Sequence, residues 1–407
     1  VLDEVVDVGA APGGGQHGID LGQGDPQGAG PHVVDIELEL GGIILEYLCR
    51  IPNICDIVTA DANADWGVRK TNCAIEGATY MGLYPRIEFY PVDALNIEKT
   101  AELLRKTNPT IILNGTTLQS WWVVNELPPE VNAKLYRDKC AIGPWAAMHL
   151  ALTSKLMKAV KMSGIDTYVV NTSFPDAINP SLARVGLAPT IGIGNMDLTI
   201  PYIQKATSEI LGVPMRNVSV ELIAHHYHCY FWCRYGRGWE APFYLRVYVG
   251  HEDVTEKLGD VKEFIAELPK RGMRPGGRHG QYVVAASSVK NIMAIFNDTA
   301  EITHAPGPLG LEGGYPVRLS RKGAEVVLPK GMTLAQAREL NVKAQVYDGV
   351  KEIRDNGDIV VTDEAYQTFK ETLGVDCRAI TVEHSYEQAI ELRRKFHEFA
   401  RKHGVNI

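Results

Sequence analysis

Residues 146–171 read AAMHLALTSKLMKAVKMSGIDTYVVN, and this stretch decides the fold class. Its pattern predicts a long helix over 146–163 and then a short apolar strand over 167–170, which ends at Asn171. A strand that is apolar on both faces and follows a helix is typical of a parallel sheet with helices on both sides. The stretch therefore predicts an α/β fold.

The same alternation extends toward the N-terminus. It predicts helices over 43–50 and 98–106 and strands over 56–60, 87–92 and 110–113. Strands and helices in this order form a Rossmann-type parallel sheet, in which ligands bind beyond the carboxyl ends of the strands. The residues at three such ends are candidate cofactor contacts: Asp61, Asn114 with Gly115, and Asn171.

Composition limits the classes of function. The chain has 407 residues, 22% of them charged, and a net charge of -8, which argues against a nucleic-acid-binding surface. No apolar run approaches the roughly 18 residues that span a bilayer. The seven cysteines show no Cys-x-x-Cys spacing, so we expect reduced thiols and no metal ion. These features predict a cytoplasmic protein with neither a nucleic-acid nor a membrane partner. The small-molecule substrate that we also expect follows from the strand-end positions above and from the resemblance given below.

The first 40 residues differ from the rest. The first Lys or Arg is Arg50, although residues 1–49 contain nine acidic side chains. Residues 9–30 contain nine glycines, a composition that sustains neither a helix nor a core. Two interpretations stay open, a flexible arm or an altered reading frame.

The position of the phosphate-binding loop follows from its distance to Asp61. The acid that binds the ribose hydroxyls lies about 20 residues beyond the loop. The G-x-G-x-x-G match at residues 13–18 is too distant, because 61 minus 18 is 43, whereas 61 minus 42 is 19. We therefore expect a first strand over 33–40, with Gly41 and Gly42 opening the helix; the alternative is that the two glycines form a simple turn. A carboxylate at Asp61 repels a 2′-phosphate and favours NAD over NADP.

The second half carries motifs in a recognisable order. Residues 169–213 read VVNTSFPDAINPSLARVGLAPTIGIGNMDLTIPYIQKATSEILGV, residues 217–232 read NVSVELIAHHYHCYFW, and residues 313–337 read GGYPVRLSRKGAEVVLPKGMTLAQA. This order resembles the lactate and malate dehydrogenase superfamily. The resemblance implies a dinucleotide-binding domain over 1–198 and an α+β catalytic domain with a C-terminal extension over 199–407.

The resemblance also implies roles for single residues. His226 would be the general acid/base, Asp197 would orient its imidazole, and Asn171 would hydrogen-bond substrate or nicotinamide. An imidazole suits this role because its ordinary pKa, about 6.5, lets it exchange a proton at neutral pH. His225 stays an alternative to His226, since a shift of one residue on a strand reverses the face.

One departure from the family concerns the substrate. The family places an Arg three residues after the catalytic Asp to bind the substrate carboxylate, whereas this chain has Ile200. We therefore expect a substrate other than lactate or malate, with Arg278 and His279 as the best compensating cations. Asn195 and His149 are further candidate substrate contacts.

These observations predict an NAD(P)-dependent oxidoreductase that transfers hydride between nicotinamide and a secondary alcohol or ketone. An NAD-dependent glycosidase or epimerase with transient oxidation and a non-catalytic dinucleotide-binding protein are the alternatives. Relatives of this fold are usually oligomeric, so we expect a homo-oligomer. The last 55 or so residues, with a strand over 358–361 and a helix over 386–402, are expected to pack as structure.

Overall fold

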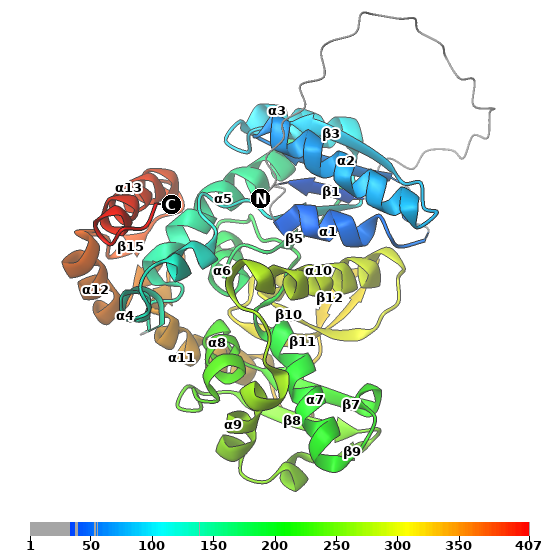
Figure 1. The fold of residues 1–407 in the computed structure, drawn as a ribbon, viewed down its shortest axis with the longest axis vertical. Helices are drawn as coiled ribbons and strands as arrows, with labels where there is room; N and C mark the ends of the chain where they lie inside the picture. Colours follow the sequence, from blue (N-terminus) through cyan, green and yellow to red (C-terminus); the bar gives the residue numbers. More distant parts are fainter. Residues whose placement is uncertain (1–32, 37–39, 53, 55, 138, 407) are drawn as a thin grey trace, which may run out of the picture.

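The computed structural model describes residues 33–36, 40–52, 54, 56–137 and 139–406. The glycine-rich match at residues 13–18 therefore lies outside the described residues. Six parallel strands form one sheet in the order β3-β2-β1-β4-β5-β6 (Figure 1), which confirms the predicted α/β fold. The strands are β1 (Val33–Ile36), β2 (Asp56–Asp61), β3 (Arg86–Pro91), β4 (Ile111–Asn114), β5 (Tyr168–Asn171) and β6 (Ile191–Gly192).

Helices connect these strands, and local signals set their ends. The side chain of Asn63 caps the start of α2 by accepting a hydrogen bond from the Trp66 amide at 3.1 Å. Gly164, with φ of 72°, ends α5 in the left-handed conformation that glycine adopts without strain. The helical segments of this half are α1 (Leu40–Leu48), α2 (Ala64–Tyr80), α3 (Ile97–Thr107), η1 (Trp121–Glu126), α4 (Pro129–Asn132), η2 (Ala133–Arg137), η3 (Gly143–Trp145), α5 (Ala146–Ser163) and α6 (Pro175–Arg184).

The predicted first strand over 33–40 is present as β1 (Val33–Ile36), whereas Leu40, which the prediction placed in the strand, already begins α1. Gly41 and Gly42 lie buried in the first turn of this helix, so they open the helix as predicted and do not form a simple turn. Their contact with a phosphate stays a prediction. A Cβ atom on Gly42 would lie 3.3 Å from the flexible Lys70 side chain of α2, which would have to shift slightly to make room for it.

The following segment forms two antiparallel sheets, in the orders β7-β8-β9 and β10-β11-β12. Its helix α10 packs against α1 and so joins the two halves of the molecule (Figure 1). The strands are β7 (Val218–Ile223), β8 (Tyr244–Val249), β9 (Glu252–Asp253), β10 (Ile302–Pro306), β11 (Gly314–Ser320) and β12 (Gly323–Val326). The helical segments are η4 (Asn195–Thr199), α7 (Ile200–Leu211), η5 (Met215–Asn217), α8 (His226–Tyr235), η6 (Thr255–Leu258), α9 (Val261–Gly272), η7 (Gly277–Gly280), α10 (Gln281–Phe296), η8 (Pro308–Gly310), α11 (Leu334–Ala344) and η9 (Gln345–Asp348).

The C-terminal segment packs back onto the first half. Trp145, at the start of α5, lies edge-on to Phe369 and Phe396, with ring centroids 5.2 and 5.1 Å apart. The predicted strand and helix of this segment are present as β14 and α13. Its elements are β13 (Val350–Ile353), β14 (Ile359–Val361), α12 (Asp363–Leu373), β15 (Ala379–Ile380) and α13 (Ser385–Lys402).

The predicted domain boundary at residue 198 would fall inside η4 and stays a prediction. Within the described part of the chain, no helix combines the length and the apolar character needed to cross a membrane.

Candidate active site

A cavity of about 410 Å³ opens beyond the carboxyl ends of the sheet strands. Gly115, Thr172 and Ile193, which directly follow β4, β5 and β6, line it, and so does Leu40 at the start of α1. The sheet order reverses between β1 and β4, and ligands of such sheets bind beside this switch point. The cavity therefore occupies the position where the fold places a ligand.

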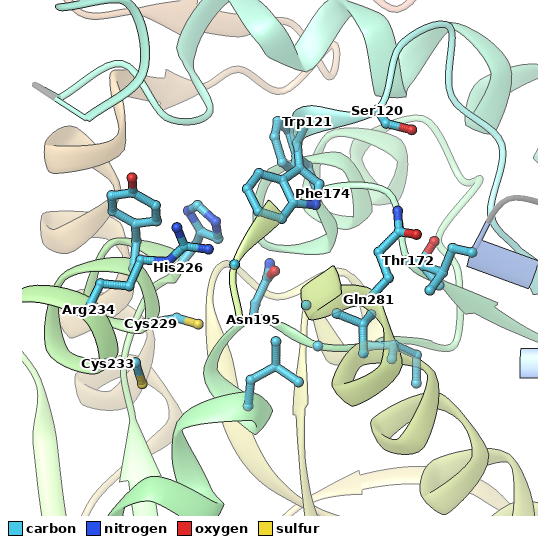
Figure 2. A pocket seen from close by; sticks show the side chains of 18 of the residues that line it. Ser120, Trp121, Thr172, Phe174, Asn195, His226, Cys229, Cys233, Arg234 and Gln281 are labelled. Atoms are coloured by element: carbon cyan, nitrogen blue, oxygen red, sulfur yellow. The ribbon is translucent and has the colours of Figure 1, made fainter. Parts of the chain in front are cut away.

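Helix α8 forms one wall of the cavity. Figure 2 shows His226, Cys229, Cys233 and Arg234 on this wall and Ser120, Thr172 and Gln281 across from them. Side chains that are three or four residues apart lie on one face of a helix, and the α8 residues turned to the cavity have this spacing. This face contains His226, Cys229, Tyr230, Cys233 and Arg234, and Tyr235 at the end of the helix also lines the cavity.

The histidine run starts this helix and does not continue the strand, which corrects the expectation that strand alternation orients these side chains. β7 ends at Ile223, His225 is the N-cap residue, and α8 begins at His226. His226 lines the cavity, whereas His225 is fully buried and does not. Within the described ranges, no group of three His, Cys, Asp or Glu side chains is placed to hold a metal ion.

A buried carboxylate lies behind His226. Asp348 Oδ1 is 3.1 Å from Nδ1 of His226, and its Oδ2 is 2.6 Å from Nδ1 of His225. Burial alone would lower the pKa of the His226 imidazole, but the charge and hydrogen bond of Asp348 raise that pKa above its ordinary value. Burial would raise the pKa of Asp348, yet the two imidazoles hold it well below its usual range. The pair thus joins an ionised carboxylate to an imidazole that favours its protonated form.

Asp197, the predicted partner of His226, points elsewhere. Its carboxylate accepts hydrogen bonds from Ser287 Oγ and Lys290 Nζ of α10, both at 2.5 Å. Asp197 is only 3% exposed, and the Lys290 ammonium is the charge that compensates its carboxylate. The residue that orients the imidazole in the structure is therefore Asp348, which corrects the prediction.

Asn114 and Asn171 lie beneath the cavity floor and do not line it. Asn114 Nδ2 donates to Asn171 Oδ1 at 2.9 Å and to Thr153 Oγ1 at 3.0 Å. Asn171 Nδ2 donates to Asn179 Oδ1 at 2.8 Å, and Asn179 in turn donates to the Gly307 carbonyl. Both amides are fully buried, and these bonds tie the ends of β4 and β5 together. The residues that line the cavity at these two strand ends are the next ones along the chain, Gly115 and Thr172.

Asp61 is the last residue of β2, as its predicted role requires. Its Oδ1 accepts a hydrogen bond from the Asn63 amide at 2.6 Å, which holds the carboxylate at the strand end. The strand beside it is β1, where the dinucleotide would lie in this fold. Its contact with a ribose stays a prediction.

Two of the predicted substrate contacts line the cavity. The His149 ring lies against Phe174, with centroids 3.9 Å apart and planes tilted by 35°. Burial lowers the pKa of His149 to about 3. Its Nδ1 has no hydrogen-bond partner among the described residues. Asn195, with φ of 50°, donates to the buried carboxylate of Asp176. A neutral imidazole and a fixed amide therefore line the cavity.

The predicted cations Arg278 and His279 lie in η7, are exposed, and do not line the cavity. Arg234 and Arg274 line it instead. Arg234 is eight residues after His226, about two turns along the same helix, and this relation is visible only once the run is known to be helical. Arg274 and Asp348 gave no local signal, because only the tertiary fold brings them to the site.

Comparison by sequence finds no match, either to a protein-family model or to a curated protein. Comparison by structure finds several. Malate dehydrogenase from Picrophilus torridus aligns with a TM-score of 0.56 at 15% identity, over 79% of this chain and 97% of its own. Malate dehydrogenase from Plasmodium falciparum aligns with a TM-score of 0.53 at 13% identity, over 89% and 99%. Lactate dehydrogenase from Cryptosporidium parvum, complexed with lactic acid and nicotinamide adenine dinucleotide, aligns with a TM-score of 0.53 at 15% identity. This alignment covers 78% of this chain and 98% of the lactate dehydrogenase. The chain has the fold of the lactate and malate dehydrogenases.

Proposed function

We propose that this protein is an NAD(P)-dependent oxidoreductase that transfers hydride between nicotinamide and a secondary alcohol or ketone. The observation that carries the proposal is the His226–Asp348 pair, set in a cavity at the switch point of the sheet. The dehydrogenase fold of the structural neighbours supports the same class of reaction.

The residues at the strand ends fit a dinucleotide. The amino end of α1 lies at the cavity, and a helix start favours the pyrophosphate through its free amides and dipole. Asp61 would hold the ribose hydroxyls and disfavour the 2′-phosphate of NADP, while Gly115 and Thr172 leave room for the nicotinamide end. When bound, nicotinamide supplies the acceptor or donor of the hydride.

His226 would move the proton that accompanies the hydride. Its Nδ1 is engaged by Asp348, which leaves Nε2 as the nitrogen for a substrate hydroxyl. In alcohol oxidation the hydroxyl proton goes to Nε2 as the carbinol carbon loses hydride, and ketone reduction returns that proton. Asp348 stabilises the imidazolium and fixes the tautomer, as in other carboxylate–imidazole pairs.

His226→Asn tests the proposal. Loss of the general base should lower the rate of NADH formation by about 10²- to 10⁴-fold, with NAD affinity nearly unchanged. The matched control is His279→Asn, an exposed histidine that does not line the cavity. A panel of secondary alcohols with NAD supplies the substrates. Net NADH formation separates a dehydrogenase from a glycosidase or epimerase that oxidises only transiently, and equal rates in wild type and His226→Asn would reject the mechanism.

A further inference from the structure

The part of the cavity that runs along α8 away from His226 has aromatic walls. Trp121 and Tyr136 stack with centroids 6.1 Å apart and an interplanar angle of 26°. Tyr230 of α8 meets Tyr136 edge-on at 5.6 Å. All three rings line the cavity, and Figure 2 shows Trp121 beside Phe174 above its centre. Flat apolar surfaces of this kind pack against a ring.

Two arginines face this aromatic section. The Arg234 guanidinium lies over the Tyr230 ring at 4.9 Å and over Trp121 at 5.8 Å. Arg274 Nε donates to the Tyr202 hydroxyl at 2.9 Å. Stacking occupies the flat face of a guanidinium and leaves its N–H edge open to an acceptor. The aromatic residues therefore position both arginines and use only one N–H, that of Arg274 Nε, which leaves the terminal N–H groups for an acceptor.

Within the described part of the chain, neither Arg234 nor Arg274 is paired with a carboxylate. The contacts of these two guanidinium groups are with the rings of Tyr230, Trp121 and Tyr202 and with the Tyr202 hydroxyl. The described residues that line the cavity include no Asp and no Glu, while the pKa of His226 is raised. Burial raises the pKa of Cys229 to about 11, so this thiol is neutral as well. The Asp348 carboxylate balances the charge of a protonated His226. Among the described residues, the positive charge that faces the cavity is therefore that of Arg234 and Arg274, and it favours an anionic ligand beside them.

We propose that the substrate carries an anionic group, bound by Arg234 and Arg274, and a planar apolar ring that lies among Trp121, Tyr136 and Tyr230. This inference rests on the proposed function, because it describes the substrate of the same site. The proposed substrate is bulkier than a small hydroxy acid, and different cations bind its anionic group. Arg234 comes from α8 and Arg274 from the loop between α9 and α10, whereas position 200 holds Ile200.

Three ketones separate the two features. Phenylpyruvate has an anion and a ring, pyruvate has the anion only, and acetophenone has the ring only. Isothermal titration of the full chain with NAD present gives dissociation constants without turnover, because no hydride donor is there. Phenylpyruvate should bind at least roughly 10-fold more tightly than pyruvate or acetophenone. Pyruvate lacks the contact with the aromatic rings, and acetophenone lacks the hydrogen bonds to the arginines.

Arg234→Gln and Arg274→Gln assign the anion contact. Each should weaken phenylpyruvate roughly 10- to 100-fold, the range for hydrogen bonds to a charged group. Acetophenone binding should not change, and Arg274→Lys should restore part of the affinity. Arg237→Gln is the matched control, because Arg237 is exposed, stacks on Phe231 and Tyr235, and does not line the cavity.

The inference is overturned by equal affinity for the three ketones, by no measurable binding of phenylpyruvate, or by equal effects of the Arg234, Arg274 and Arg237 variants. Failure of the proposed function gives a different result, because it removes hydride transfer in the turnover assay while these dissociation constants keep their pattern.

Discussion

Replacing Asp348 by Asn tests which carboxylate serves the catalytic histidine. The substitution keeps the shape of the side chain but removes the charge that both His225 and His226 contact, at 2.6 and 3.1 Å. An amide has a single oxygen, so it cannot accept from both imidazoles as the carboxylate does. At least one of these hydrogen bonds is therefore lost, together with the charge.

The expected loss follows from the hydrogen bonds. A bond to a charged group contributes about 1.5–3 kcal/mol, which is roughly 10- to 150-fold in rate if it acts on the imidazolium. Asp348 is fully buried and the His226 side chain is only 10% exposed, so breaking the pair should also cost about 3–5 kcal/mol of unfolding free energy. Circular dichroism melting defines the temperature range in which the variant is folded and its rate can be read.

The assay is single-turnover NADH formation from NAD and a secondary alcohol over a range of pH. The wild-type rate should rise with pH through a midpoint above about 6.5, because the imidazole must be neutral to accept the proton and Asp348 raises its pKa. In Asp348→Asn the midpoint should move to lower pH and the plateau should fall. Asp197→Asn is the control and should leave the midpoint in place. A lower rate and midpoint in Asp197→Asn, with neither in Asp348→Asn, would refute the reasoning.

Three other predictions concern cofactor, assembly and acid stability. NAD should bind more tightly than NADP, and Asp61→Ala should reduce this difference in affinity. Equal affinities for NAD and NADP in titrations of the wild type would reject the role of Asp61. Light scattering at micromolar concentration should give the mass of a homo-oligomer, and a monomer mass would contradict this. Burial lowers the pKa of His149 to about 3 and those of His228 and His304 to about 4, so below pH 6.5 the unfolded chain binds protons that the folded chain does not. Each of these three histidines should lower the unfolding free energy by about 2 kcal/mol between pH 7 and pH 5. The raised pKa of His226 partly offsets this loss, because it stabilises the fold below pH 6.5. Urea unfolding that gives equal stability at pH 7 and pH 5 would contradict this account.

The sequence predicted the sheet well, because its strands are short, buried on both faces and separated by amphipathic helices. The predicted helix over 146–163 coincides with α5, and the resemblance in motif order anticipated the dehydrogenase fold. Local pattern carries this information, since burial on both faces leaves an apolar run that few other structures produce.

The site was harder to predict, because its partners come together only through tertiary contacts. His226 and Asp348 are 122 residues apart, and nothing near Asp348 in the sequence marks it as a partner of an imidazole. The histidine run reads as a strand by alternation, but the chain turns into α8 there, so the faces are those of a helix. Asn171 was placed at the correct strand end, yet its amide is consumed by Asn114 and Asn179.

Asp348 hydrogen-bonds the His226 imidazole at the cavity and raises its pKa, and the proposed mechanism depends on this pair. The most direct measurement is an NMR titration of histidine-labelled protein, with the His226 signals assigned from His226→Asn. The account predicts a His226 pKa above about 6.5 in the wild type. It also predicts a clear fall in Asp348→Asn and no change in Asp197→Asn. A His226 pKa that falls in Asp197→Asn and stays unchanged in Asp348→Asn would contradict it.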